Sequence, residues 1–82
     1  MPKKPIANIT NWSLELGFYN DGRAALWGTV TNHPNKELNH RYVRTSPVVR
    51  ITDKEVETEN TIYVLGHRVD KAIENDSTIK GD

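Results

Sequence analysis

The chain has 82 residues, of which 35% are hydrophobic, and it contains no cysteine. This length allows one small domain with a single core, and the lack of cysteine excludes disulfides and thiolate-bound metal as sources of stability. The formal net charge is zero, which argues against a general nucleic-acid binder, since these usually carry a strongly basic surface. Oligomerisation is the remaining common way to stabilise so small a core, so we expect a homo-oligomer.

The first predicted elements are an arm and a hairpin. Residues 1–10 are rich in proline and lysine and are predicted to form a flexible arm. Residues 11–19 alternate apolar and polar side chains, which is typical of a half-buried strand. The sequence Asn-Asp-Gly at 20–22 is a turn signal, and a second strand is expected over residues 23–32.

The length of this turn decides which side chains share a face. A two-residue loop would place Leu16 opposite Trp27, whereas a three-residue loop with Gly22 in the left-handed conformation pairs Tyr19 with Arg23. We prefer the longer loop because it gathers the apolar residues of both strands on one face: Trp12, Leu14, Leu16, Phe18, Ala24, Leu26 and Val30. Trp27 then points away from the core, as an interface or stacking surface, unless another segment covers it.

A third strand is expected over residues 41–52, interrupted or bulged at Pro47, which lacks a backbone donor. The odd positions are predicted to face inward: Val43, Thr45, Val49 and Ile51. The even positions are predicted to face outward, with Val48 as the exception: Tyr42, Arg44, Ser46 and Arg50.

Two short strands complete the predicted sheet. The first covers residues 55–59 and projects three glutamates to one side, and the second covers residues 61–65. The helical spacing of Val69, Ala72 and Ile73 then predicts a short C-terminal helix, so that the domain spans residues 11–74 and residues 75–82 form a polar tail. Five short strands with regular turns favour an all-β fold, namely a small five-stranded antiparallel barrel or curled sheet.

Catalytic and metal sites find little support. The histidines His33, His40 and His67 lack the paired spacing of a structural zinc site. The hydroxyls of Thr45 and Ser46 lie near histidines in sequence only, and the chain has no G-x-S-x-G motif. Alternating glutamates are more typical of a solvated, edge-protecting strand face than of paired catalytic carboxylates. We therefore predict no metal, no cofactor and no enzyme activity.

An anion site is the better hypothesis. Residues 31–52 carry four basic side chains against one acidic, whereas residues 53–82 carry eight acidic against four basic. Arginine, an aromatic ring and a hydroxyl in one outward row are what a nucleotide requires. Arg41 is out of phase with Arg44 unless it belongs to the preceding loop or comes from another subunit. The candidate ligand-binding residues are Arg44, Arg41, Tyr42, Trp27, His33, Thr45 and Ser46. The competing interpretation is an arginine row that simply pairs with the acidic strand.

Three segments carry a resemblance: G-T-V-T-N-H-P (28–34), R-Y-V-R-T-S-P-V (41–48) and Y-V-L-G (63–66). Together they resemble a group of small uncharacterised phage and bacterial proteins with the pattern G-x-V-x-G-H-P followed by R-[VI]-x-T-S-x-[IV]. The chain departs from this pattern at Asn32 and in the loop 35–40. By analogy with phage counter-defence proteins, the resemblance implies an oligomeric sponge that sequesters a nucleotide immune signal.

The leading expectation is therefore non-catalytic binding and sequestration of a small anionic ligand, probed most directly at Arg44. The alternative is a protein-binding inhibitor or adaptor that uses an exposed surface of Trp27 and the arginines. A structural phage component is a third hypothesis. No stretch approaches the roughly 18 apolar residues of a membrane-spanning helix, and no secretory signal pattern is visible, so we expect a cytoplasmic protein without membrane contact, in the host cell if phage-encoded.

Overall fold

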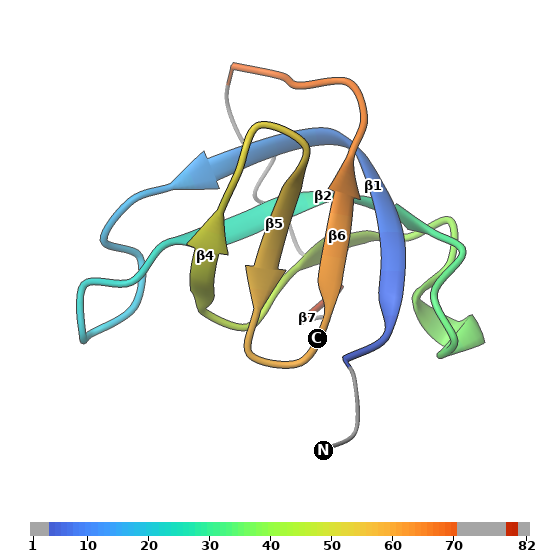
Figure 1. Cartoon of the computed structure of the whole chain (residues 1–82), viewed down its shortest axis with the longest axis horizontal. Helices are drawn as coiled ribbons and strands as arrows, with labels where there is room; N and C mark the ends of the chain where they lie inside the picture. The colour runs from blue at the N-terminus through green and yellow to red at the C-terminus, as the bar shows by residue number, and fades with distance from the viewer. Residues whose placement is uncertain (1–3, 71–78, 81–82) are drawn as a thin grey trace.

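The regular secondary structure of the described residues consists of strands and one short 3₁₀ turn (Figure 1). The computed structural model describes residues 4–70 and 79–80. The strands are β1 Ile6–Glu15, β2 Ala25–Thr31, β3 Tyr42–Arg44, β4 Val48–Ile51, β5 Glu55–Thr58, β6 Ile62–Leu65 and β7 Ile79–Lys80. A single 3₁₀ turn, η1 Lys36–Leu38, separates β2 from β3. The predicted all-β class is confirmed. Within the described ranges, no helix is long and apolar enough to cross a membrane.

The strands form one mixed sheet in the order β4-β5-β6-β1-β2-β3-β7. Neighbours in sequence pair antiparallel, but β6 pairs with β1 in parallel, with Ile62 opposite Ile6. The predicted purely antiparallel sheet is therefore wrong. β3 and β4 form one bent run, so the chain from β1 to β6 consists of five runs that reverse direction at each hairpin. The first run, β1, and the fifth, β6, therefore point the same way and can pair only in parallel.

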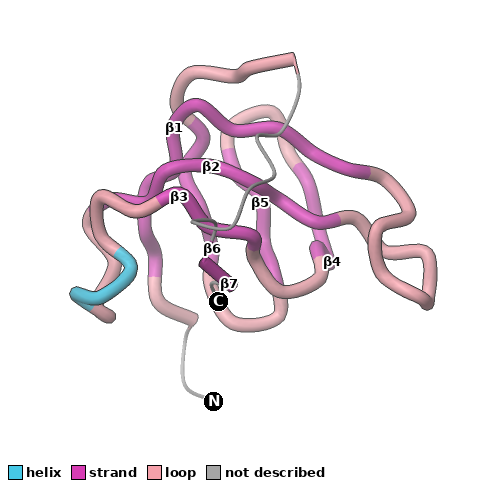
Figure 2. The backbone as a smooth tube through the Cα atoms, turned by 180° about the vertical axis from the view of Figure 1, so that it is seen from behind, coloured by secondary structure: helices cyan, strands magenta, loops and turns pink. Residues whose placement is uncertain are grey.

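The sheet is strongly curled, although its ladder is not closed into a barrel. Figure 2 shows β2 and β3 crossing the face of β5 and β6. The connection between β3 and β4 lies against β2, because Thr45 N donates to Leu26 O at 2.9 Å and Val48 N donates to Ala24 O at 2.9 Å. The inside of the curl holds the buried apolar cluster, which comprises Ala7, Ile9, Trp12, Ala24, Leu26, Val30, Leu38, Val43, Val48, Val56 and Tyr63.

The start of β1 corrects the predicted arm. β1 begins at Ile6, and Ala7 and Ile9 are each only 1% exposed. The prediction over residues 1–10 is therefore wrong for residues 6–10. Proline and lysine dominate the first five positions, but the following apolar-polar alternation finds a ladder partner in β6, which lies far along the chain.

The β1–β2 turn has the predicted tip but a different strand register. Gly22 has φ +87°, and Tyr19 N donates to Arg23 O at 3.1 Å. Below the tip, however, the ladder pairs Leu26 with Leu14, whereas the preferred Tyr19–Arg23 register, continued along both strands, would pair it with Leu16. The cause is Gly17, whose φ of +70° bends the chain out of the strand. Residues 16–18 therefore leave the core face.

β1 also contains a bulge opposite Gly28. Thr10 pairs with Thr29, but the next pair is Ser13 with Trp27, so two residues of β1 oppose one of β2. Gly28 is required at this point because a Cβ there would lie 2.6 Å from Cγ1 of Ile9. The bulge places Ser13 beside Trp27 on the face away from the core.

The third strand is interrupted around Pro47 as predicted, and Val43 and Thr45 are fully buried. The prediction fails in β4, where Val49 is 47% and Ile51 is 50% exposed. A register shift between Val48 and Arg50 changes the alternation, so Val48 enters the core and the next residues do not.

The end of the chain departs from prediction where it is described. Arg68 forms a bridge with Trp12, and Val69 N donates to Trp12 O at 2.8 Å, so Val69 does not begin a helix. Ala72 and Ile73, the other two residues of the predicted helix, lie outside the described residues. Within the predicted polar tail, β7 adds to β3 in parallel.

Candidate anion-binding site

A cross-strand row on the outer face of the sheet brings three of the relevant residues together. Ser13 on β1 pairs with Trp27 on β2, which in turn pairs with Arg44 on β3. Directly opposed residues on neighbouring strands have Cβ atoms about 4.5–5.5 Å apart. The two polar side chains therefore flank the indole ring. We call this set, together with Phe18 and Tyr42, the outer-face cluster.

Trp27 lies on the outer face as the predicted parity requires, but it is not an exposed surface. Its side chain is only 3% exposed. Phe18 and Trp27 form an edge-to-face pair with ring centroids 5.8 Å apart. The Tyr42 ring, on the neighbouring strand, has its centroid 6.4 Å from that of Trp27. Of the two alternatives that the sequence left open, a covered tryptophan is the one found. The covering rings include that of Phe18, which was predicted to lie in the core.

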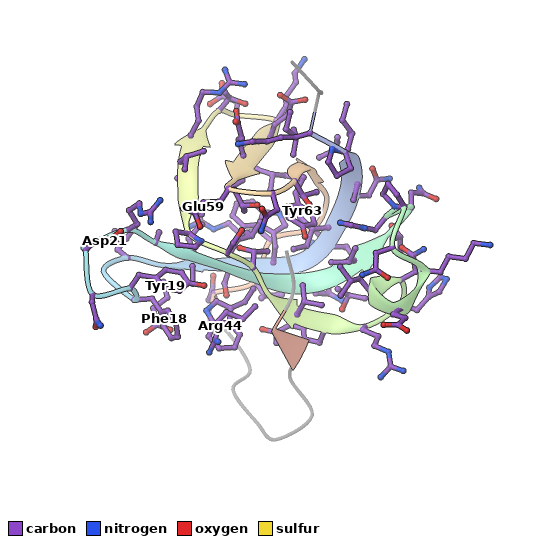
Figure 3. All side chains as sticks on the ribbon, turned by 90° about the horizontal axis from the view of Figure 1, so that it is seen from below. Phe18, Tyr19, Asp21, Arg44, Glu59 and Tyr63 are labelled. Carbon is purple, nitrogen blue, oxygen red and sulfur yellow. The ribbon has the colours of Figure 1, made fainter. Side chains whose placement is uncertain are left out.

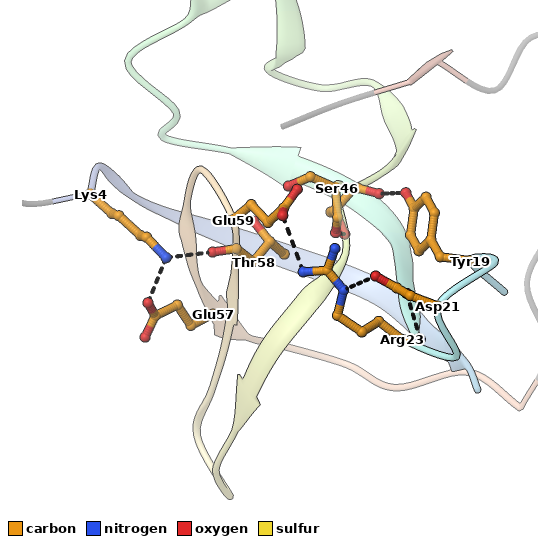
Figure 4. A network of polar contacts seen from close by, with 9 residues as sticks. Lys4, Tyr19, Asp21, Arg23, Ser46, Glu57, Thr58 and Glu59 are labelled. Atoms are coloured by element: carbon orange, nitrogen blue, oxygen red, sulfur yellow. Dashed lines mark hydrogen bonds and ion pairs between the residues drawn. The ribbon is translucent and has the colours of Figure 1, made fainter. Parts of the chain in front are cut away.

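The loop between β1 and β2 positions Phe18 over this face. Tyr19 packs against Phe18 with ring centroids 5.0 Å apart, and its hydroxyl donates to the carbonyl of Thr45. Arg23 bonds Asp21 at 2.6 Å and reaches Glu59 at 3.1 Å, which ties the loop to the β5–β6 turn (Figure 4). The sequence predicted the turn, but these tertiary contacts determine where the loop lies.

The guanidinium of Arg44 lies close to two aromatic rings. Its Cζ is 4.9 Å from the Phe18 ring centroid and 5.9 Å from that of Trp27, both within the range of cation–π attraction. Figure 3 shows Phe18, Tyr19 and Arg44 on one side of the sheet, whereas Tyr63 lies inside the curl. Within the described ranges, Arg44 forms no ion pair.

Arg23 and Arg50 behave differently, whereas Arg68 resembles Arg44: its Cζ lies 5.2 Å from the Trp12 ring centroid, and it forms no ion pair among the described residues. Arg50 lies 3.4 Å from Glu57, and Arg23 is held by two acids as described above. Pairing with the acidic strand therefore accounts for Arg50 but not for Arg44. Lys4 also binds Glu57, at 2.6 Å, and its hydrogen bond is the main reason that the pKa of Glu57 lies below its ordinary value. The acidic strand is thus largely occupied by cations other than Arg44 (Figure 4).

The row contains buried polar atoms without hydrogen-bond partners. In the part of the chain that the structure describes, these include Ser13 Oγ, Trp27 Nε1 and Arg44 Nε. An unmatched buried donor costs free energy, and such groups are few in folded proteins. Three of them lie in adjacent positions of one row, which makes this face the candidate site.

The remaining predicted residues lie elsewhere. Thr45 is fully buried, and its Oγ1 accepts from Leu26 N and donates to Ser46 O, so it braces the strand break. Ser46 is also buried, with no partner for Oγ among described residues. Arg41 is exposed and precedes β3, where its carbonyl accepts from Val30 N.

His33 has an internal structural role. It is 5% exposed, its Nδ1 accepts from Asn35 N at 2.9 Å, and its Nε2 lies 3.2 Å from Thr61 Oγ1. It therefore fixes the loop after β2 against the β5–β6 turn. We exclude His33 and Thr45 from the site. Among the described residues, no three histidine, cysteine or acidic side chains gather as a metal site would require.

Sequence reasoning missed two members of the cluster. Phe18 was assigned to the core because it continues the alternation of β1, and Ser13 was treated as a solvent-facing strand residue. Gly17 was the one available signal that the alternation would end. Comparisons with protein-family models, curated proteins and solved structures found no match, so the cluster itself is the basis for a functional argument.

Proposed function

We propose that the protein binds a small anionic ligand, a nucleotide, at the outer-face cluster without chemically altering it. The observation that carries the proposal is Arg44, an arginine without an acidic partner in the described ranges whose guanidinium rests on Phe18 and Trp27. Contact with aromatic faces leaves the edges of a guanidinium available for phosphate oxygens. Arg23 and Arg50, by contrast, already form ion pairs with carboxylates.

The aromatic residues support a nucleotide over a simple inorganic anion. Phe18, Trp27 and Tyr42 lie within one cluster beside the charge, and nucleotide-binding surfaces combine aromatic planes with cationic groups. The biological setting that we propose follows from the resemblance described above. In that setting the protein sequesters a nucleotide immune signal in the host cytoplasm as a phage counter-defence protein.

A depletion-and-release assay tests this function. The protein is incubated with cyclic dinucleotides, cyclic trinucleotides, ADP-ribose derivatives and linear nucleotides that end in a terminal phosphate. The free ligand is measured after filtration, and the protein is then heat-denatured to release what it holds. We expect one nucleotide to disappear and to return intact. A nucleotide that returns altered would indicate an enzyme. If no member of the panel is depleted, the proposed function is wrong.

Two arginine variants sharpen the assay. Arg44→Ala should abolish depletion while retaining a cooperative thermal transition, because Arg44 is only half-buried and forms no ion pair in the described chain. Arg50→Ala removes the same charge from an exposed position on β4, where Glu57 already neutralises it, and should deplete normally. Equal loss in both variants would mean that general charge, and not the cluster, is responsible.

We also propose a homo-oligomer. In the sheet as described, β4 is an edge strand, and it exposes Val49 and Ile51. Apolar side chains on an edge favour pairing with a second copy of the chain. Light scattering after gel filtration should give a multiple of the chain mass, and Val49→Lys should reduce it to one chain. The alternative adaptor function receives less support, since Trp27 is buried.

A further inference from the structure

The unpartnered donors indicate which part of the ligand the cluster receives. Resting on the proposed function, we propose that Ser13, Trp27 and Arg44 form a receptor for a terminal phosphate group, which lies beneath Phe18. The Ser13 hydroxyl, Trp27 Nε1–H and Arg44 Nε–H donate to its oxygens. Ser13 and Trp27, at 4% and 3% exposed, are thereby assigned a binding role as well as a place in the sheet.

The chemistry of the three atoms selects an acceptor group. An indole Nε1–H and a guanidinium Nε–H can only donate, and a serine hydroxyl can donate as well. A base edge mixes donors with acceptors, so it would match this row poorly. A terminal phosphate offers three acceptor oxygens and negative charge beside the guanidinium, and charge-assisted hydrogen bonds are the stronger kind.

The sheet register places the three residues in one row. The three residues are successive cross-strand neighbours, and each carries an atom that is buried and unpartnered in the described part of the protein. Arg44 Nε is itself such a buried atom, so the arginine offers a donor on its sheet side. The anion therefore binds between the guanidinium and the sheet, and not on the outer surface of the arginine.

Access requires movement of the loop that carries Phe18. Gly17 and Gly22 have positive φ values on either side of Phe18 and Tyr19, so the loop bends at residues that tolerate this geometry. Its outer contacts are the Tyr19 hydroxyl bond and the ion pair of Arg23 with Glu59. Both can open without disturbing the buried cluster inside the curl.

Indole resonances provide a direct test. The protein has two tryptophans, and Trp12 serves as an internal reference because its Nε1 already donates to Gly66 O at 3.0 Å. ¹⁵N-labelled protein is titrated with adenosine 5′-monophosphate, inorganic phosphate, cyclic 3′,5′-adenosine monophosphate and adenosine. We expect the Trp27 indole proton to move downfield with the two terminal phosphates, with little change from the cyclic diester or adenosine and none at Trp12.

Ser13→Ala separates binding from structure. Because the hydroxyl has no partner in the described chain, its removal should leave the melting temperature of the free protein unchanged or slightly higher. The same change should weaken adenosine 5′-monophosphate binding about tenfold, the value of one hydrogen bond to a charged group. A purely structural serine would instead lower the melting temperature and leave affinity unchanged, which would overturn the assignment.

The outcomes distinguish this inference from the proposed function. If a nucleotide is depleted in an Arg44-dependent manner but neither terminal phosphate moves the Trp27 resonance, the phosphate receptor is wrong and the binding function stands. If adenosine moves Trp27 as strongly as the monophosphate, the row receives a base and the inference again fails. If no nucleotide binds in either experiment, both proposals fall together.

Discussion

Gly28→Ala tests the close packing that brings β1 and β2 together behind the cluster. A Cβ at this position would lie 2.6 Å from Cγ1 and 2.9 Å from Cδ1 of Ile9, and 3.0 Å from the carbonyl oxygen of Thr10. These separations are far below ordinary contact, and Ile9 is 1% exposed, so it has little room to move. We expect a loss of about 2 kcal/mol in the free energy of unfolding, typical of overpacking a core.

Urea denaturation and a thermal melt measure this loss. For a domain of this size, about 2 kcal/mol lowers the melting temperature by roughly 10 °C. The double variant with Ile9→Ala supplies the control, because removing the isoleucine branch creates the space that the new methyl group needs. Gly28→Ala should then cost much less in the Ile9→Ala background than in the wild type. Strictly additive losses, or a Gly28→Ala protein as stable as the wild type, would refute the close approach.

Three further predictions concern the loops. Tyr19→Phe removes the hydroxyl bond to Thr45 and should cost about 1 kcal/mol in urea denaturation, with faster proteolysis of the 16–24 loop; unchanged cleavage would contradict the proposed anchoring. His33→Ala loses two buried ring contacts and should cost about 2 kcal/mol, measured the same way; a loss within 0.5 kcal/mol, typical of a surface site, would contradict the structural role. Arg23, first through its backbone N–H and then through its guanidinium, holds the pKa of Asp21 below its ordinary value. This contribution is present above about pH 4 and is lost as the pH falls through the lowered pKa. Asp21→Asn should therefore lower the urea midpoint at neutral pH and approach the wild type in acid; a pH-independent difference would contradict it.

Local patterns predicted much of the hairpin correctly. Gly22 has the expected left-handed conformation, and Trp12, Leu26 and Val30 are buried together. The same alternation failed at Leu16, which is 81% exposed. Periodicity reports which faces a chain could present, but it does not show where a strand ends. Here β1 ends at Glu15, just before Gly17 with its positive φ.

The candidate site shows the same division. Arg44 and Tyr42 could be named as candidates from the sequence, because alternation places them on the same strand face and because arginine is a common phosphate ligand. Ser13 was not, because a serine in a strand carries no signal until its neighbour across the sheet is known. Its significance comes from the β1 bulge, which aligns it with Trp27, and from a hydroxyl that finds no partner in the described structure.

The sequence by itself determined the all-β class, the main turns, the break at Pro47 and the excess of basic side chains in the middle of the chain. These follow from local backbone preferences and side-chain alternation, which act over a few residues. Only the tertiary structure decided that β6 pairs with β1 in parallel and that Phe18 lies on the outer face. It also decided that Arg50 pairs with an acidic residue, whereas Arg44 has no acidic partner within the described residues. Each of these depends on contacts between residues far apart in the chain, where the geometry of the whole sheet selects among locally equivalent alternatives.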